Sequence, residues 1–117
     1  LLGGKTPPQG SPSYMSPEQI RGQALDARSD IYSYGCVIFE LLAGRPPYTS
    51  SDTNDLLNKH VSAAVPAVDT VNRNATADAT KLLRQMLAKK PADRPSSMQE
   101  VLGRLRAIRL VERTTVG

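Results

Sequence analysis

Apolar side chains are concentrated in one segment of the chain, SDIYSYGCVIFELLAG, at residues 29–44. Within residues 31–43, only Ser33, Gly35 and Glu40 are neither apolar nor aromatic. A segment that is apolar on nearly every side is expected to be surrounded by protein. It is too short and too charged to cross a bilayer, which needs about 20 apolar residues. The pattern therefore predicts a buried element at the centre of the fold.

The composition of this segment fits a buried helix or a buried strand, because Val37, Ile38 and Phe39 are also good strand formers. The segment is longer than the roughly 4–8 residues of an ordinary strand. Gly44 and the two prolines at 46–47 are typical of a helix stop. We therefore favour a central helix.

Two short helices are predicted on either side of the central one. Ser16 as N-cap and Pro17 as the first helical residue begin one that ends at Gly22. Ser51 or Asp52 can cap another, which runs to about residue 61. Residues 1–12 and 62–75 are expected to be loops, because prolines and glycines interrupt the first and the second has no clear period.

The last third of the chain contains two amphipathic segments. Apolar residues of 76–87 recur at i, i+3, i+4, i+7 and i+8, which is one helical face. After an exposed turn expected at 92–94, between two prolines, Ser96 predicts an N-cap, with Gln99 completing a capping box. The chain after Leu110 is expected to fray. The predicted fold class is mainly α, with about four shorter helices and long loops around a buried central helix.

Composition and charge add little to this picture. Apolar residues make up 39% of the 117, with no Trp and one Phe, which is lean for an independent core. The net charge is +4, which could attract nucleic acid. However, no Lys/Arg block alternates with aromatic residues, so we expect the basic residues to lie on solvent-exposed helix faces and not to form a nucleic-acid-binding surface. Cys36, the only cysteine, is expected to be a small buried hydrophobe, and His60 a surface residue. We expect no signal peptide and no membrane segment, and LLGGKTPP suggests that the chain starts inside a longer protein.

Three motifs are more specific: GSPSYMSPE at 10–18, DIYSYG at 30–35 and LAKKPADRP at 87–95. In this order and spacing they closely resemble the second half of the large lobe of Ser/Thr protein kinases, of the bacterial, eukaryotic-like type. Ser16-Pro17-Glu18 stands where the family has A-P-E. The resemblance covers residues 10–108 and implies a large-lobe fragment, preceded by an activation-loop remnant at 1–9 and followed by a tail at 109–117.

The resemblance implies structural roles for five residues. Glu18 and Arg94 would form the family's ion pair between the activation segment and the late helices; the alternative is two unrelated surface charges. Asp30 would accept N–H bonds from the catalytic loop; alternatively it caps its own helix. Val37 and Leu41 match positions that support the hydrophobic stack under the nucleotide, although ordinary core packing explains them equally well.

The resemblance also implies a substrate pocket and a regulatory site. Ser11, Pro12, Tyr14 and Met15 would shape the pocket for the substrate residue that follows the phospho-acceptor. Ser11 stands where the family usually has Thr, so the hydroxyl is kept but the methyl group that fixes its rotamer is lost. Thr6 is a candidate phosphosite, since a phosphate there could order the loop against basic residues; an unmodified loop threonine is the alternative.

The catalytic motifs of this family are not found in the sequence. Phosphoryl transfer needs a Gly-rich loop, a strand Lys, an H-R-D loop and a D-F-G Asp for Mg²⁺. The only His is followed by Val61, the only Phe is followed by Glu40, and no G-x-G-x-x-G occurs. We therefore expect no catalytic residue, no metal site and no bound cofactor in this chain, although ATP and Mg²⁺ are implied for the intact kinase.

The sequence therefore predicts part of a protein Ser/Thr kinase that is not competent alone. Its implied partner is a protein substrate, with no nucleic acid, and its implied location is the cytoplasm, whether or not the parent is anchored in a membrane. One alternative is a free-standing helical interaction module derived from a kinase lobe. Another is a basic nucleic-acid-binding module, which would show salt-sensitive binding.

Overall fold

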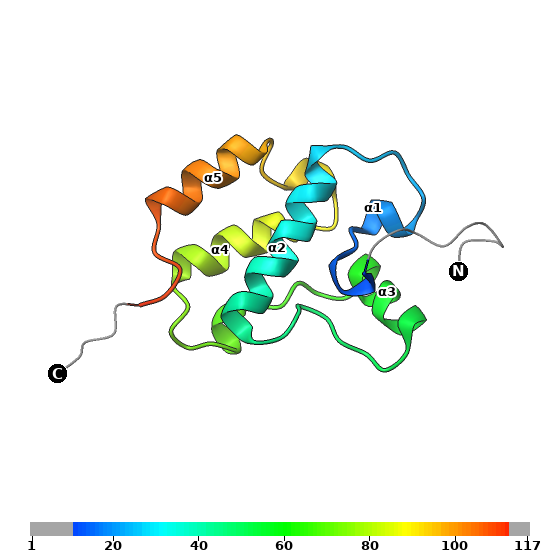
Figure 1. Ribbon diagram of the computed structural model, residues 1–117, viewed down its shortest axis with the longest axis horizontal. Coiled ribbons are helices and arrows are strands. Elements are labelled where there is room, and N and C mark those ends of the chain that lie inside the picture. Colours follow the sequence, from blue (N-terminus) through cyan, green and yellow to red (C-terminus); the bar gives the residue numbers. More distant parts are fainter. Residues whose placement is uncertain (1–10, 113–117) are drawn as a thin grey trace.

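The computed structural model describes residues 11–112, and within this range the fold is helical without strands (Figure 1). The five α-helices are α1 (Pro17–Ile20), α2 (Ala27–Ala43), α3 (Thr53–Ser62), α4 (Ala77–Met86) and α5 (Met98–Ala107). Three short 3₁₀ helices are η1 (Pro12–Tyr14), η2 (Val68–Thr70) and η3 (Pro91–Asp93). The mainly α prediction is confirmed, as is the number of shorter helices.

Helix α2 is the central element, and it packs against α4, α5, η1 and η2. It begins earlier than predicted, because the Asp26 side chain accepts the Arg28 N–H at 2.8 Å and so caps the helix. It ends at Gly44, whose φ of 80° is in the left-handed region that favours glycine. Figure 1 shows α2 crossing in front of α4, with α5 above α4 in this view.

The other helices begin at side-chain caps, which explains why their positions could be predicted. Ser16, Asp52 and Thr76 each accept a backbone N–H three residues on. The predicted cap of α5 is wrong by one residue. Ser97 accepts the Glu100 N–H at 3.1 Å, whereas the Ser96 hydroxyl donates to the Glu100 carboxylate.

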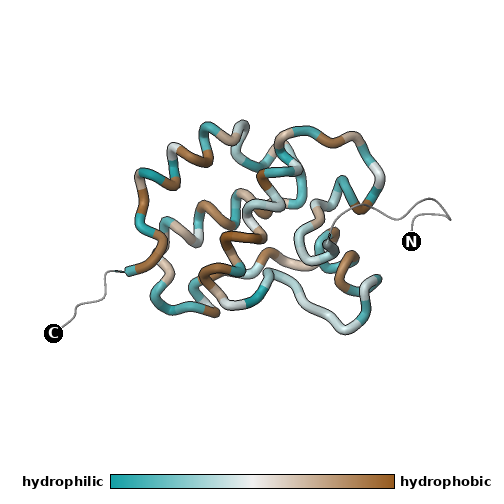
Figure 2. Tube along the Cα trace, viewed as in Figure 1, coloured by the Kyte–Doolittle hydropathy of each residue, from teal (hydrophilic) through white to brown (hydrophobic). Residues whose placement is uncertain are grey.

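The core lies between α2, α4 and α5, and apolar positions gather along α2 and α4 (Figure 2). Its largest fully buried members are Tyr32, Phe39, Ile31, Leu82, Met86, Leu87, Val68 and Val101. Cys36 is also buried, as predicted, and burial raises the pKa of its thiol to about 12, so it stays protonated at neutral pH. A second, smaller cluster of Met15, Ile20 and Leu57 joins the chain around α1 to α3.

Two predictions about loops are wrong. Residues 62–75 contain η2, whose Val68 is buried in the core. The chain does not fray directly after Leu110, because the Leu110 carbonyl accepts the Thr76 N–H and Val111 forms an isolated antiparallel bridge with Ala75. The part of the predicted tail beyond residue 112 lies outside the described residues.

Gly35 determines how closely α2 and α4 approach each other. A Cβ at this position would lie 3.0 Å from the Met86 Cβ and 3.1 Å from the Leu87 Cδ2. Gly35→Val is therefore expected to lower the free energy of unfolding by about 1–3 kcal/mol through overpacking. Urea denaturation measures this change. Gly103→Val on α5, where an added Cβ meets nothing within 4 Å, is the control and should cost nothing; equal losses in both variants would contradict the close packing.

Candidate functional site

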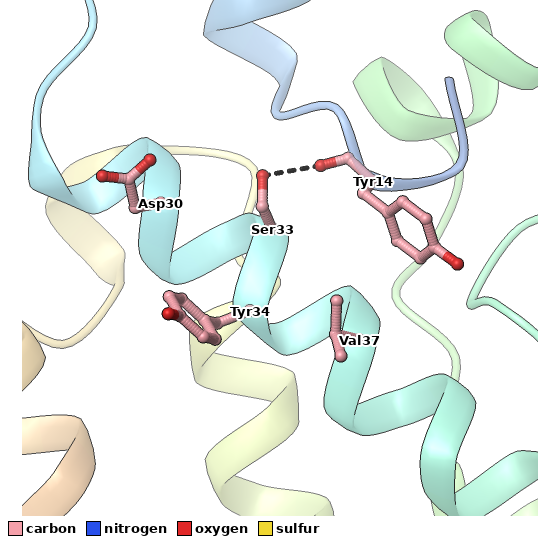
Figure 3. Close-up of a pocket in the computed structure, with 5 residues that line it drawn as sticks. All are labelled: Tyr14, Asp30, Ser33, Tyr34 and Val37. Carbon is pink, nitrogen blue, oxygen red and sulfur yellow. Dashed lines mark hydrogen bonds between the residues drawn. The ribbon is translucent and has the colours of Figure 1, made fainter. Parts of the chain in front are cut away.

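The loop around η1 lies against α2 and α3. Ser33 Oγ donates to the Tyr14 carbonyl at 2.7 Å (Figure 3), and the Tyr14 hydroxyl donates to the Glu40 carboxylate. The bond to Glu40 raises the pKa of Tyr14, because it stabilises the protonated phenol. Met15 is buried, and the Ser11 hydroxyl caps η1 by accepting the Ser13 N–H. The four predicted substrate-pocket residues thus form one ordered turn, with Pro12 as its first helical residue.

A cavity of about 220 Å³ opens beside this loop, between Tyr14 and one face of α2. Figure 3 shows its lining, which consists of Tyr14, Asp30, Ser33, Tyr34 and Val37. The Asp30 side chain is exposed and makes no hydrogen bond or ion pair with any residue of the described range. Asp26 and not Asp30 provides the N-cap of α2, whereas Asp30 lies in the first turn of the helix, where its negative charge favours the helix dipole.

Three apolar side chains continue this face of α2 along the helix. Tyr34 is 55% exposed, Val37 41% and Leu41 78%. We call these three residues the α2 stripe; their spacing of three and four residues places them on one side of the helix. The expectation that the central helix is surrounded on every side is therefore wrong for this face, and ordinary packing does not explain Val37 and Leu41.

Glu18 and Arg94 meet in a buried ion pair. Arg94 Nη1 and Nη2 lie 2.6 and 2.9 Å from the two Glu18 carboxylate oxygens, in the bidentate geometry typical of arginine. The remaining N–H groups of the guanidinium donate to the carbonyls of Arg28, Ala88 and Lys89, so all five donors are used. They are not unrelated surface charges. The turn predicted to be exposed at 92–94 is exposed at its first two residues, but Arg94 is buried.

The carboxylate side of this pair is equally well satisfied. Ser29 Oγ donates to Glu18 at 2.7 Å. Burial raises the pKa of the Glu18 carboxyl, but the hydrogen bonds from Arg94 and Ser29 outweigh burial and hold the pKa below its usual value of 4.5. Arg94 also lies over the Tyr32 ring, 5.0 Å from its centroid. The pair thus joins α1, the start of α2 and the segment after α4.

His60 was predicted to be a surface residue, and this prediction is wrong. Its side chain is fully buried, between the edges of the Tyr32 and Tyr48 rings, with centroids at 5.7 and 5.0 Å. Its Nδ1 lies 2.7 Å from the Tyr32 hydroxyl oxygen. The signal was present in the sequence, because His60 follows Leu56 by four residues and Leu57 by three, on the buried face of α3.

Lys89 was expected on a solvated helix face, but it is half-buried and its ammonium is bonded to other parts of the fold. Its ammonium donates to the Tyr48 hydroxyl at 2.8 Å and to the carbonyls of His60 at 2.8 Å and Lys59 at 3.2 Å. These carbonyls belong to the last turn of α3, where a cation is favourable. Burial lowers the pKa of Lys89 to about 8. Lys89 therefore connects the end of α4 to the end of α3.

Burial, followed by the positive charge of Lys89, lowers the pKa of His60 from 6.5 to about 4. The unfolded chain therefore binds more protons than the folded chain between these values, and the stability that neutral His60 contributes is present above pH 6.5 and is lost as the pH falls. We expect the free energy of unfolding to fall between pH 6.5 and 4.5, by no more than about 1.4 kcal/mol per pH unit.

Urea denaturation at several pH values measures this slope. His60 is the only histidine, and the Glu18 carboxyl, whose pKa is also lowered, adds to the slope only as the pH approaches 4.5. His60→Gln should flatten the profile between pH 6.5 and 4.5. Asn58→His, which adds an exposed imidazole to the same helix, should leave the slope of the profile unchanged. A profile that stays steep in His60→Gln would contradict this account of the buried ring.

No group of three His, Cys, Asp or Glu side chains that could hold a metal ion occurs among residues 11–112. None of the helices in the described range is long and apolar enough to cross a membrane. The candidate phosphosite Thr6 lies outside the described residues.

Comparison with known proteins indicates the same family as the three sequence motifs. Residues 3–104 match the family model described as "Protein kinase domain". The serine/threonine-protein kinase PknB of Mycobacterium tuberculosis is 37% identical over 92 residues, which are 79% of this chain and 15% of that protein. The serine/threonine-protein kinase pkn3 of Myxococcus xanthus is 36% identical over 101 residues, 85% of this chain and 18% of that protein.

A third relative is the DNA damage-responsive serine/threonine-protein kinase RqkA of Deinococcus radiodurans, 36% identical over 88 residues, which are 75% of this chain and 13% of that protein. The chain belongs to the protein kinase family and is related to the bacterial serine/threonine kinases. It spans less than a fifth of the length of these relatives.

Proposed function

We propose that this chain is the C-terminal part of the large lobe of a bacterial-type Ser/Thr protein kinase. The intact enzyme would transfer the γ-phosphate of ATP to Ser or Thr hydroxyls of a protein substrate. The observation that carries the proposal is one face of α2, on which the unpaired Asp30 and the α2 stripe stand uncovered side by side. A carboxylate without a partner next to exposed apolar side chains is the surface expected where a further part of the same lobe packs.

In this proposal Asp30 accepts backbone N–H bonds from the catalytic loop and so supports the active site from below. Its exposure and its lack of a partner within the described residues leave both oxygens available for those bonds. Val37 and Leu41 support the hydrophobic stack beneath the nucleotide, since both are exposed on the same face.

The turn that contains Ser11, Pro12, Tyr14 and Met15 forms the pocket for the substrate residue after the phospho-acceptor. Two hydrogen bonds between Tyr14 and α2, with Ser33 and Glu40, hold this turn in place against the helix. The Glu18–Arg94 pair holds the following segment onto the late helices. Thr6 is a candidate site of activating phosphorylation.

In this proposal the catalytic base and the phosphate cradle belong to other parts of the kinase domain. ATP and Mg²⁺ would be held by the parts of the kinase domain that carry the Gly-rich loop, the H-R-D loop and the D-F-G Asp. This chain would contribute the substrate-pocket loop and the structural core at 10–108, with 1–9 as the end of an activation loop and 109–117 as a tail, in the cytoplasm. Alone it would not transfer phosphate.

The coding frame upstream of Leu1 tests the proposal. The roughly 60 residues that precede the chain are expected to contain H-R-D-x-x-x-x-N followed by D-F-G. A frame that lacks both motifs would overturn the proposal and would favour the free-standing interaction module. That alternative predicts that the chain is a cooperatively folded monomer, and the exposed α2 stripe counts against it.

A further inference from the structure

The last described residues of the chain run back along the start of α4. After α5, the segment 109–112 returns to the residues that precede α4, where Val111 and Ala75 form the isolated antiparallel bridge. Figure 1 shows this segment, coloured toward the red end of the bar, beside the beginning of α4. We call residues 109–112 the exit strap, because the chain leaves the described fold through them.

Three hydrogen bonds hold the exit strap. The Thr76 N–H donates to the Leu110 carbonyl at 3.1 Å, and the Glu112 N–H donates to the Asn74 carbonyl at 2.7 Å, as in an antiparallel strand pair. The Thr76 hydroxyl donates to the Arg109 carbonyl at 2.5 Å. Every group that the strap contributes is a backbone group, so these bonds do not depend on the side chains of the strap.

Thr76 takes part in two structures with one hydroxyl group. Its oxygen accepts the Ala79 N–H at 3.0 Å and so caps α4, while its proton is directed to the strap. A hydroxyl donates one hydrogen bond and can accept others, so threonine can serve both partners. Thr76 is buried, although the strap that lies on it is exposed. The cap of α4 and the closure of the strap therefore share a residue.

Asn72 fixes the segment that receives the strap. Its side-chain oxygen accepts the Asn74 N–H at 2.9 Å, and its carbonyl accepts the Ala75 N–H at 3.0 Å. Its side-chain nitrogen donates to the Leu42 carbonyl at 2.9 Å. Leu42 lies in the last turn of α2, where carbonyls have no partner within the helix. The receiving segment is thus joined to the end of the central helix by bonds that do not involve the strap.

The strap itself buries little surface. Arg109, Val111 and Glu112 are exposed, and Leu110 is only half-buried. Ile108, directly before the strap, packs against the core and holds the end of α5 in place. Segments with few buried apolar contacts and exposed backbone hydrogen bonds open at a low free energy. The strap can therefore open while α4 and α5 stay folded.

We propose that the exit strap is a releasable latch, which closes on residues 74–76 as one unit and fixes where the chain leaves the fold. When it is closed, the chain beyond Glu112 starts from a point that is tied to α4 and, through Asn72, to the end of α2. When it is open, the Thr76 N–H and the Asn74 carbonyl lose their partners. A pull on the chain beyond Glu112 acts on these bonds before it acts on α5. This inference does not rest on the proposed function.

Thr76→Asp and Thr76→Ser separate the strap from the helix cap. Aspartate still caps α4, but its carboxylate cannot donate to the Arg109 carbonyl, whereas serine can do both. In the complete protein, hydrogen exchange of the Glu112 amide is expected to be about threefold to tenfold faster in Thr76→Asp and within about twofold of the original in Thr76→Ser. The Ala79 amide, which reports the cap, should stay slow in both.

Glu112→Pro tests the latch from its other side and leaves α4 untouched. Proline has no N–H, so the bond to the Asn74 carbonyl is lost, whereas the control Glu112→Ala keeps it. The amide that reports the effect is that of Thr76, which is bonded to Leu110 and not to residue 112. If the strap closes as one unit, this amide should exchange about threefold to tenfold faster in Glu112→Pro and should be unchanged in Glu112→Ala.

Three results would overturn the inference, and none of them depends on kinase activity. A Glu112 amide that exchanges in the original protein as fast as in an unfolded chain would show that the strap is not closed in solution. A Thr76 amide that is equally slow in Glu112→Pro and Glu112→Ala would show that the bonds open independently. Equal acceleration in Thr76→Asp and Thr76→Ser would show that the hydroxyl donor does not hold the strap.

Discussion

Replacing Arg94 by methionine is expected to lower the free energy of unfolding by about 3–5 kcal/mol, which is a large part of the total stability of a domain this size. The change leaves the Glu18 carboxylate buried without its cation, and it also leaves three carbonyls without their donors. Urea denaturation followed by circular dichroism measures the loss.

The control is Arg104→Met. Arg104 is partly exposed, and its ion pair with Glu100 spans 3.9 Å, so the loss should stay below about 1 kcal/mol. The double variant Glu18→Leu with Arg94→Met should cost less than the sum of the two single changes, because no charge then remains buried. Strictly additive losses would contradict the pairing.

Leu41→Ala is expected to change the free energy of unfolding little in the 117-residue chain and strongly in the complete kinase. In the 117-residue chain, where this side chain is 78% exposed, the change should alter the free energy of unfolding by no more than about 0.5 kcal/mol. In the complete kinase, where we propose that the catalytic half covers α2, the same change should cost about 2–5 kcal/mol.

Two further substitutions serve as references for this comparison. Phe39→Ala, on the buried side of α2, should cost about 3–5 kcal/mol in both contexts. Leu102→Ala, at an exposed position of α5, should cost little in either. A loss for Leu41→Ala that is the same in the chain and in the complete protein would contradict the idea that a further segment covers the α2 stripe.

The sequence predicted the helices well where their signals are local. Ser16, Asp52 and Thr76 are caps within a few residues of the apolar face that they introduce, and the spacing of Leu82, Leu83 and Met86 identifies the buried side of α4. Ser96 and Ser97 are equivalent in pattern, since each has a polar residue three positions on. Only the observed backbone distinguishes them.

The sequence could not predict which apolar face of α2 stays uncovered. Phe39 and Leu41 are equally apolar in sequence, yet one is 1% and the other 78% exposed. Periodicity identifies faces of a helix, but the coverage of a face depends on other segments of the protein. The resemblance implies that Val37 and Leu41 support a hydrophobic stack under the nucleotide, and this role stays a prediction.

The polar cluster around His60 was missed for a related reason. A polar side chain is expected on the surface unless partners satisfy it. The partners of His60 and Lys89 are Tyr32, Tyr48 and backbone carbonyls, which lie between 12 and 41 residues away from them in sequence. The helical spacing places His60 on the buried face of α3, but the identity of its polar partners depends on tertiary structure and cannot be predicted from local pattern.

Phosphate transfer from ATP labelled on its γ-phosphate tests the central claim most directly. The protein encoded by the complete reading frame and the 117-residue chain are incubated in parallel with ATP, Mg²⁺ and a protein substrate. We expect label on Ser or Thr residues of the substrate with the complete protein and none with the chain alone. Transfer by the chain alone, or none by the complete protein, would contradict the account.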